Sequence, residues 1–365
     1  MNRKILDRYL LLEAGGAWFA VTLVLLAIML ATRFTRALTQ AAAGNLPKEL
    51  LFEVAALSSL QYLVILIPFS LLLAIMLALG RLYKDNEIAA MTGCGVGLSG
   101  LYRPFLVLGV LLAILTGALA FEIGPWAGRT ADYLVKNAAR LIQYNPFEAG
   151  HFKDVAAGRA MFYTEETQGQ GEKLGAVFAL IHEPEGDSIV VAQAGEQNVD
   201  ENGQREVRLH NGLRYRGQAG RADYDIMRFE QFSTRESPPN FFYMNSKRAL
   251  QPTLELIASG SREDRAELAW RIAAPVSVFI LGLLAVPLSH VGPRQGRYGK
   301  LVAGIVIYLV YAQLMGVGQS WIAKGRTPDW LGLWWVHAIV LCVALLLTAH
   351  RQGLLQGRFA WRRRR

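Results

Sequence analysis

Six apolar stretches surround one long polar block, and this arrangement restricts the fold more than any other feature of the chain. Each stretch lacks Asp, Glu, Lys and Arg and is long enough, at 1.5 Å per helical residue, to cross a hydrocarbon core about 30 Å thick. The stretches are Ala14–Thr32, Val54–Leu79, Pro104–Phe121, Ile272–Ser289, Leu301–Ala323 and Trp330–Ala349. The block between the third and fourth stretches, Glu122–Glu267, is too polar to lie in lipid. We therefore predict a membrane α-helical bundle of six transmembrane helices, with three on each side of an inserted domain.

Basic residues predict the direction in which the chain crosses the membrane. The sequence has a formal charge of +9 and 53% hydrophobic residues. A positive charge can indicate nucleic-acid binding, but here most basic residues flank the spans or lie in Arg362–Arg365, which argues against it. Short segments on one side of the predicted spans carry fifteen Lys and Arg residues, whereas those on the other side carry five. The positive-inside rule then places both termini in the cytoplasm and the inserted domain outside.

The polar block alternates apolar and polar residues with a period of two, which predicts an all-β domain. The predicted strands are Ala160–Thr164, Val177–His182, Ser188–Ala192, Val207–His210 and Tyr224–Phe229, with turn signals such as Asn211-Gly212 between them. Short strands at this spacing favour an antiparallel sandwich or jellyroll. The predicted domains are an N-terminal membrane half (1–121), a β-jellyroll-like domain with helical connectors at Thr130–Ile142 and Ser261–Trp270 (122–267), and a C-terminal membrane half with a basic tail (268–365).

The sequence gives no support for chemistry catalysed by this chain alone. The segment Gly296–Leu301 lacks the glycine spacing and the Ser or Thr after lysine that a nucleotide-binding P-loop requires. The six histidines are scattered without metal-ligand spacing, and no Gly-x-Ser-x-Gly nucleophile motif occurs. We expect no cofactor or metal on this chain, and the absence of charged residues inside the spans argues against an ion-coupled carrier.

A short helix is predicted between the second and third spans, at about residues 82–95. Asp85 is a suitable N-cap, Glu87 falls in the first turn, and Gly93 or Gly95 can end the helix. Ile88 and Met91 lie three residues apart, on one face. Two interpretations remain open from these residues: a rigid helix that docks into a cytoplasmic partner, or a loop helix that lies on the bilayer surface.

Four of the five basic residues on the side that the positive-inside rule disfavours lie at the outer ends of spans. Arg33 and Arg36 lie three residues apart at the outer end of the first span, and Lys324 and Arg326 follow the fifth span. Guanidinium groups bind phosphate bidentately, so these residues are candidates for contact with an anionic headgroup. Simple snorkelling of long side chains to the interface is the alternative.

Several segments resemble a known family of membrane proteins. They are Leu66–Leu71, Leu79–Met91, Ala266–Ile272, Pro287–Ser289 and Pro293–Arg297. Together with the layout of the spans, they resemble the YjgP/YjgQ (LptF/LptG) family of lipopolysaccharide-export permeases over essentially the whole chain, and Ala266–Ile272 and Pro293–Arg297 resemble its LptF branch. The chain departs from the family at Gly95-Val-Gly97, where the family has Gly-x-Ser, and in the Arg362–Arg365 run.

The resemblance implies a multi-pass protein of the bacterial inner membrane with a periplasmic β domain. It implies an LptG-like second permease, an LptB-like ATPase dimer that supplies ATP and Mg, an LptC-like bitopic protein and a periplasmic LptA-like bridge, with lipopolysaccharide as the substrate. Coupling to the ATPase would involve Glu87 and its neighbours Tyr83, Asp85, Ile88 and Met91. Lipid A phosphates would contact Arg33, Arg36, Lys324 and Arg326.

A lipid with several acyl chains needs an apolar path once it leaves the membrane, because each CH₂ exposed to water costs about 0.8 kcal/mol. We expect inward-facing residues of the β domain to form such a path, or alternatively a closed core; the candidates are Phe162, Phe178, Ile189, Val191 and Phe229. Two other functions remain open: a lipoprotein-extracting ABC permease, which usually has one span before its domain and three after, and a non-transporting envelope assembly or sensor protein.

Overall fold

The computed structural model describes residues 3–351 apart from 43–45, 144–148, 156–159, 169–171, 184–185, 200–204, 219–222, 237–246, 291–296 and 329. The predicted basic tail and most of the Pro293–Arg297 segment lie outside the described residues. The chain forms two compact units: a helical unit of Met1–Thr39, Glu49–Asp132 and Asn245–Arg365, and a second unit of Gln40–Lys48 and Tyr133–Met244. These units divide the chain at other positions than the predicted residues 122 and 267.

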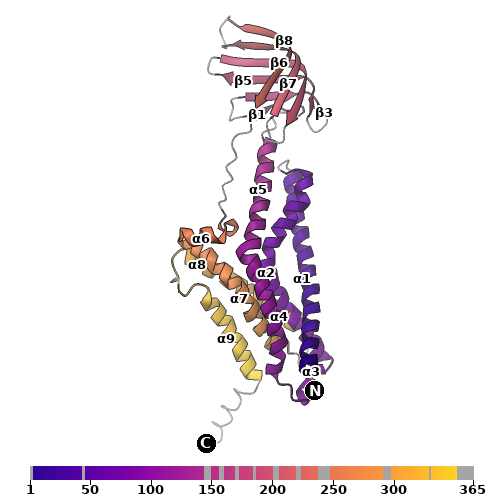
Figure 1. The fold of residues 1–365 in the computed structure, drawn as a ribbon, viewed down its shortest axis with the longest axis vertical. Helices are drawn as coiled ribbons and strands as arrows, with labels where there is room; N and C mark the ends of the chain where they lie inside the picture. The colour runs from indigo at the N-terminus through magenta and orange to yellow at the C-terminus, as the bar shows by residue number, and fades with distance from the viewer. Residues whose placement is uncertain are drawn as a thin grey trace. The chain divides into compact units, whose positions relative to one another are not determined.

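The six predicted membrane spans are confirmed as helices of sufficient length and apolarity (Figure 1). The elements of the first half are α1 (Arg3–Ala42), η1 (Lys48–Leu50), α2 (Leu51–Lys84), α3 (Glu87–Gly93), α4 (Leu98–Ala118), η2 (Leu119–Ile123) and α5 (Gly124–Gln143). Those after the inserted domain are η3 (Arg248–Leu250), α6 (Thr253–Ser259), α7 (Arg262–Leu288), α8 (Arg297–Ala323) and α9 (Trp334–Arg351). The first five spans continue into segments that the sequence treats as flanks or connectors, whereas α9 begins four residues after the predicted Trp330.

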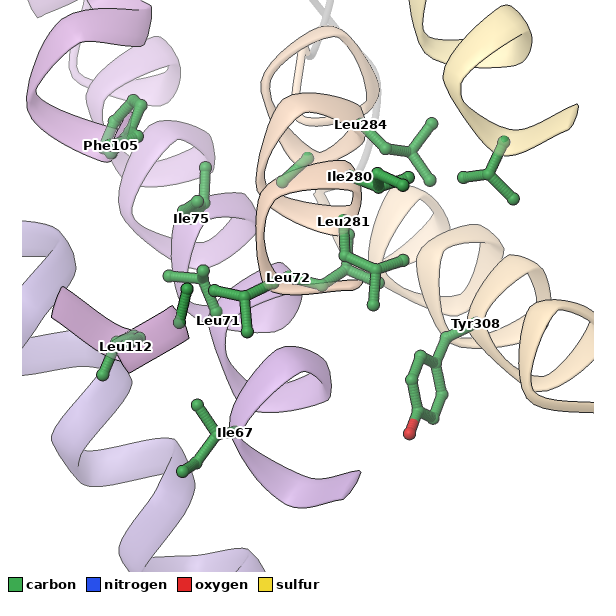
Figure 2. Close-up of a cluster of buried hydrophobic side chains, with 14 of the residues drawn as sticks. Ile67, Leu71, Leu72, Ile75, Phe105, Leu112, Ile280, Leu281, Leu284 and Tyr308 are labelled. Carbon is green, nitrogen blue, oxygen red and sulfur yellow. The ribbon is translucent and has the colours of Figure 1, made fainter. Parts of the chain in front are cut away.

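Helix α7 lies at the centre of the helical unit, where it packs against α2, α4, α8 and α9. Large apolar side chains fill the contact with α2 and α4, as Figure 2 shows; they include Ile67, Leu71, Leu72, Ile75, Phe105, Leu112, Leu281 and Leu284. The helix begins at Ser261, whose hydroxyl accepts a hydrogen bond from the backbone N–H of Asp264 at 3.1 Å. This N-cap explains why the predicted connector and the fourth span form one helix.

The third span also continues without a break, through a π-helical turn at Leu119–Ile123 into α5. A β-carbon on Gly124 would lie 2.6 Å from the carbonyl oxygen of Leu119, so a side chain there would clash with the turn. The hydroxyl of Thr253 in α6 donates a hydrogen bond to the carbonyl oxygen of Phe121 at 2.5 Å. The widened turn is therefore held by a contact from a segment that is 132 residues away in sequence.

The inserted domain is all-β, as predicted. Its described residues form one eight-stranded antiparallel sheet, in which β1, β2, β5, β6, β7 and β8 are neighbours in that order. Strand β4 pairs with the later part of β6, and β3 pairs with β4. The strands are β1 (Lys153–Val155), β2 (Ala160–Thr164), β3 (Thr167–Gln168), β4 (Lys173–Leu174), β5 (Val177–Glu183), β6 (Gly186–Val199), β7 (Arg205–Gly217) and β8 (Asp225–Glu236). All five predicted strands are present, and most are longer than predicted.

The predicted turn at Asn211-Gly212 is wrong, because β7 runs through both residues. Asn211 has a left-handed backbone (φ 53°), a conformation that asparagine tolerates better than most residues. Asn211 shifts the alternation of β7, so that Leu209 and Gly212 lie on the same face. Phe229 of β8 pairs with Gly212 and therefore joins Leu209 in one buried cluster. The ring of Phe229 occupies the space above Gly212, where a β-carbon would lie 2.3 Å from it. Glycine is required here by packing and not by a chain reversal.

Candidate functional site

The predicted coupling helix forms, but it is shorter than expected. Helix α3 spans Glu87–Gly93, whereas the predicted residues before it belong to α2, which continues to Lys84. The N-cap position of α3 is Asn86 in a left-handed conformation, so the prediction that Asp85 caps this helix is wrong. Asp85 instead ends α2, where its backbone N–H donates to the carbonyl oxygen of Arg81 at 2.9 Å and the N–H of Asn86 donates to that of Tyr83 at 3.2 Å.

The two faces of α3 have different surroundings. Ile88 is 4% exposed and lies in the bundle core, and Met91 packs against that core. The opposite face, with Ala89, Ala90 and Thr92, is exposed. The apolar pair that the sequence assigned to a partner therefore attaches the helix to its own bundle. Glu87, Asp85 and the small residues of the outer face remain accessible to a partner.

Glu87 is part of a polar cluster that joins α3 to the beginning of α1 and the end of α2; we call it the Tyr9 cluster (Tyr9, Glu13, Arg81 and Glu87). The Tyr9 hydroxyl donates to the Glu87 carboxylate at 2.8 Å and accepts from the Arg81 guanidinium at 3.0 Å. Arg81 also pairs with Glu13 at 3.2 Å. A displacement of Glu87 would therefore change the hydrogen bonds that α3 makes with α1 and, through Tyr9, with α2.

Tyr83, the remaining residue of the predicted coupling set, faces inward. Its side chain packs against the bundle core, and its ring lies 4.9 Å from the His290 ring, centroid to centroid. Burial lowers the pKa of His290, which favours the neutral imidazole. The contact joins the end of α2 to the segment after α7, so the Tyr83 ring packs within the helical unit and does not present a surface.

The four predicted phosphate-contacting residues form two separate groups. Arg33 and Arg36 lie on α1, whereas Lys324 and Arg326 follow α8, and Figure 1 shows α1 and α9 on opposite sides of the helical unit. The Arg33 guanidinium lies 3.8 Å above the centre of the Tyr62 ring, and its Nε has no hydrogen-bond partner among the described residues. Arg36, Lys324 and Arg326 are exposed.

The five predicted residues of the β domain do not share one face of the sheet. Phe162 pairs with Ala179 and Phe229 pairs with Gly212, which places both rings with the buried cluster. That cluster consists of Leu174, Val177, Ala179, Val190, Ala192, Val207, Leu209 and Phe229, with Phe162 and Phe232 packed against it. Phe178, Ile189 and Val191 lie on the opposite face, because neighbouring strand residues point to opposite sides. The expectation of one common inward face is therefore wrong for this set.

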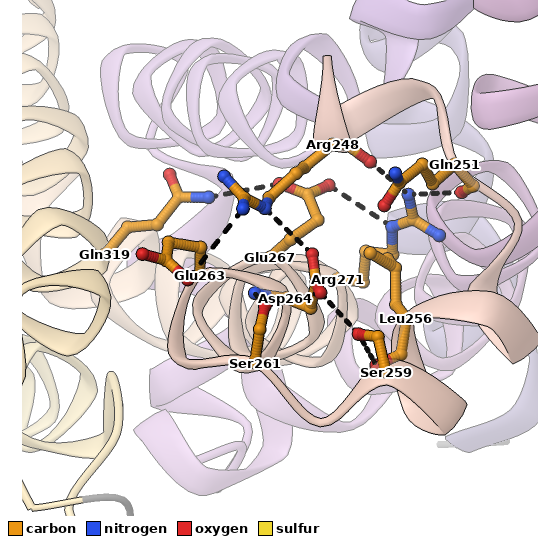
Figure 3. Close-up of polar contacts among 10 residues, drawn as sticks. All are labelled: Arg248, Gln251, Leu256, Ser259, Ser261, Glu263, Asp264, Glu267, Arg271 and Gln319. Carbon is orange, nitrogen blue, oxygen red and sulfur yellow. Dashed lines mark hydrogen bonds and ion pairs between the residues drawn. The ribbon is translucent and has the colours of Figure 1, made fainter. Parts of the chain in front are cut away.

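A buried ionic network at the start of α7 is absent from the sequence predictions; we call it the Arg271 network (Figure 3). Arg271 is only 2% exposed, and its guanidinium donates to Glu267 at 3.2 Å and to the Thr253 hydroxyl at 2.7 Å. It also donates to the carbonyl oxygens of Arg248, Ala249 and Gln251. Gln319 of α8 completes the network by donating to Glu267 at 3.1 Å.

A second set of contacts holds the same chain segment to the first turn of α7. Arg248 donates to Asp264 at 2.9 Å, and the hydroxyls of Ser259 and Ser261 also donate to the Asp264 carboxylate. The segment from η3 to α6 is thus held to α7 at two points, Asp264 in the first turn and Arg271 farther along the helix. The i, i+4 spacing of Glu267 and Arg271, just before an apolar run, is the sequence signal that could have revealed the network.

Comparison with known proteins identifies the family. The model of the family described as "Lipopolysaccharide export system permease LptF/LptG" matches residues 8–350. The chain belongs to the LptF/LptG family of lipopolysaccharide export permeases. It is 29% identical to the lipopolysaccharide export system permease protein LptF of Escherichia coli K12, over 94% of both chains, and equally similar to the protein of that name from Shigella flexneri.

Membership in the LptF/LptG family fits the helical unit and the inserted β domain, and it makes this chain a permease of lipopolysaccharide export. The match includes α3, the Tyr9 cluster and the Arg271 network, all of which lie within residues 8–350. Among the described residues, no group of three or more His, Cys, Asp and Glu side chains is placed to hold a metal ion.

Proposed function

We propose that this chain is the transmembrane permease subunit of an ATP-driven exporter that extracts lipopolysaccharide from the outer leaflet of the inner membrane. An LptG-like permease would complete the membrane cavity, and an LptB-like ATPase dimer would bind at α3. An LptC-like protein and an LptA-like bridge would receive the substrate from a periplasmic β domain. The family match over residues 8–350 is the observation that carries this proposal. The distribution of basic residues supports cytoplasmic termini.

A lipoprotein-extracting permease and an envelope sensor are less well supported. The first usually has one span before its external domain, whereas this chain has three. A sensor has no need of a short cytoplasmic helix with an accessible carboxylate such as Glu87. Purification in mild detergent tests the proposal: an ATPase and a second permease should accompany the chain. Purified chain that exports lipopolysaccharide without an ATPase would contradict it.

We propose that acyl chains travel along the face of the sheet that carries Val190 and Phe229. This face already gathers apolar side chains into one cluster, and a lipid moved from membrane to such a surface avoids most of the cost of exposing CH₂ groups to water. The opposite face, which carries Phe178, Ile189 and Val191, serves as the comparison because it belongs to the same strands.

A photo-crosslinking amino acid at Val190 should therefore capture lipopolysaccharide during ATP-driven transport, whereas one at Val191 should not. The two residues are neighbours on β6, but Val190 is 3% exposed and Val191 is 43% exposed, on opposite faces. Crosslinked lipid is measured by immunoblotting with and without ATP. Equal capture at both positions, or capture at Val191 alone, would remove the assignment of this face.

Replacing Arg33 and Arg36 together with glutamate should weaken the binding of phosphorylated lipid A. Each charge-assisted hydrogen bond contributes about 1.5–3 kcal/mol, so we expect affinity to fall at least about tenfold. Affinity can be measured by thermophoresis of the reconstituted complex, with dephosphorylated lipid A as the ligand control. Lys48 is also an exposed basic residue on the same predicted side, and Lys48→Glu, which changes the charge as much as one of the two arginine exchanges, is the control. Unchanged affinity in the double variant would leave both arginines as interface anchors.

The same exchange at Lys324 and Arg326 tests the second group on its own. Because these residues follow α8 and not α1, their effect should add to that of Arg33 and Arg36 if both groups contact the substrate.

A further inference from the structure

A cavity of about 240 Å³ lies between α7, α8 and α9, away from α1 and α2. Its walls are mainly apolar and include Ala269 and Ile272 of α7 and Ile322 of α8. Concave apolar sites with a few polar groups are the usual form of a small-molecule or lipid site. None of the residues predicted from the sequence to bind substrate or ATPase lines this cavity.

His337 of α9 supplies the cavity with a buried polar group. The side chain is 4% exposed, and its Nδ1 lies 3.1 Å from the Tyr311 hydroxyl. Its Nε2 has no hydrogen-bond partner among the described residues. Buried polar atoms almost always have a partner, and an imidazole inside a membrane-spanning helix is unusual without one. The free nitrogen therefore points to a ligand with a hydrogen-bonding group.

Positive charge and tryptophan lie beside the cavity. Arg265 is among the lining residues, and the Arg262 guanidinium lies against Gly325 in the segment after α8. Trp334 also lines the cavity and is 52% exposed, and nearby in sequence Trp330 is 79% exposed. Tryptophan is enriched at the level of lipid headgroups. These residues indicate that the cavity opens at the boundary between hydrocarbon and headgroups.

We infer that this cavity binds an anionic phospholipid of the surrounding bilayer. One acyl-chain segment lies between Ala269 and Ile322, an ester or hydroxyl oxygen bonds His337, and the phosphate lies near Arg265. Engineered cavities of about 150 Å³ bind a single benzene ring, so a volume of about 240 Å³ suits part of one chain and not the several chains of lipid A. This bound lipid is a fixed component of the permease and does not rest on the proposed export route.

The test uses the complete transporter in nanodiscs of phosphatidylcholine and phosphatidylglycerol. One arm contains phosphatidylglycerol with a diazirine in one acyl chain, and the other contains lipid A with the same group. Crosslinked peptides are then located by mass spectrometry. We expect phosphatidylglycerol to label the segments that contain Ala269, Ile322 and Leu333 above the level of other lipid-facing segments.

Three variants make the result specific. Ala269→Trp should fill the cavity and reduce this labelling to the background level, whereas Val306→Trp, at an exposed site on α8, should leave it unchanged. His337→Phe keeps a ring of similar shape but removes both nitrogens. It should lower labelling about two- to tenfold, the effect of one hydrogen bond, while the elution profile of the complex stays normal. Arg265→Glu, at an exposed position, should favour phosphatidylcholine over phosphatidylglycerol.

Labelling that is spread evenly around the helical unit and is insensitive to Ala269→Trp would overturn the inference. Stronger labelling of the same segments by lipid A than by phosphatidylglycerol would overturn it as well, because the cavity would then belong to the substrate. A failure of lipopolysaccharide export with normal phosphatidylglycerol labelling would contradict the proposed function alone.

Discussion

Replacing Glu87 with lysine should abolish both ATPase association and lipopolysaccharide export. Glu87 lies in the first turn of α3, where its carboxylate is accessible and also bonds Tyr9 at 2.8 Å. Loss of one partner of a charge pair at an interface costs about 2–5 kcal/mol, so binding of the ATPase should fall at least about thirtyfold. Co-purification with the ATPase and transport into acceptor proteoliposomes measure the two effects.

Tyr9→Phe separates docking from internal stability. This variant removes the hydroxyl that Glu87 and Arg81 bond, but it leaves the charge of Glu87 in place. If Glu87 acts through a partner, Tyr9→Phe should retain most ATPase binding. If the two variants lose binding equally, Glu87 only positions α3 through the Tyr9 cluster. Normal export by Glu87→Lys would show that the coupling assignment is wrong.

Replacing Arg271 with methionine should destabilise the helical unit more than any other single change considered for this chain. The variant leaves Glu267 buried without its cation. It also removes the donor to three backbone carbonyls, those of Arg248 and Ala249 in η3 and of Gln251 just after it. Breaking a buried ion pair by removing one partner costs about 3–5 kcal/mol. The free energy of unfolding can be followed by titration with sodium dodecyl sulfate, using far-ultraviolet circular dichroism.

Arg248→Met is the matched control. It also removes an arginine that bonds an acidic residue of α7, but the Arg248 side chain is 48% exposed. The buried Asp264 carboxylate keeps its hydrogen bonds from the hydroxyls of Ser259 and Ser261 when Arg248 is removed, so this variant should be milder. Adding Glu267→Gln to Arg271→Met should recover part of the loss, since no uncompensated carboxylate remains and Gln319 still has a partner. Equal effects of Arg248→Met and Arg271→Met would show that burial does not decide the energetics here.

Hydrophobicity alone located the spans correctly, because a helix that crosses lipid needs about 20 apolar residues wherever its partners lie. The positions of the strands followed from their alternation for a similar local reason. The boundaries were harder to predict. Glu267 was assigned to a connector and Arg271 was left outside the fourth span because both are charged, whereas in the structure the two side chains form an ion pair and α7 continues through them.

The candidate site residues depended on tertiary contacts that no local pattern contains. Ile88 and Met91 form an apolar pair on one helix face, but the sequence could not tell whether this face contacts a partner or the chain's own bundle. The facing of Phe178 and Phe229 depends on register, since a shift of one residue moves a side chain to the other face. Arg33 and Lys324 share a predicted membrane level, but only the fold separates α1 from α8.

Helix α1 is a single rod of 40 residues that carries Tyr9 near its beginning and Arg33 near its end. Those 24 residues of separation correspond to about 36 Å along the axis. Gly15 and Gly16 interrupt the rod just after Glu13, and a β-carbon at either position would meet nothing within 4 Å. Consecutive glycines are the usual place where a long helix bends. In the proposed exporter, bending at this point would let the end of α1 that carries Tyr9 move with the ATPase while Arg33 and Arg36 stay at a lipid headgroup.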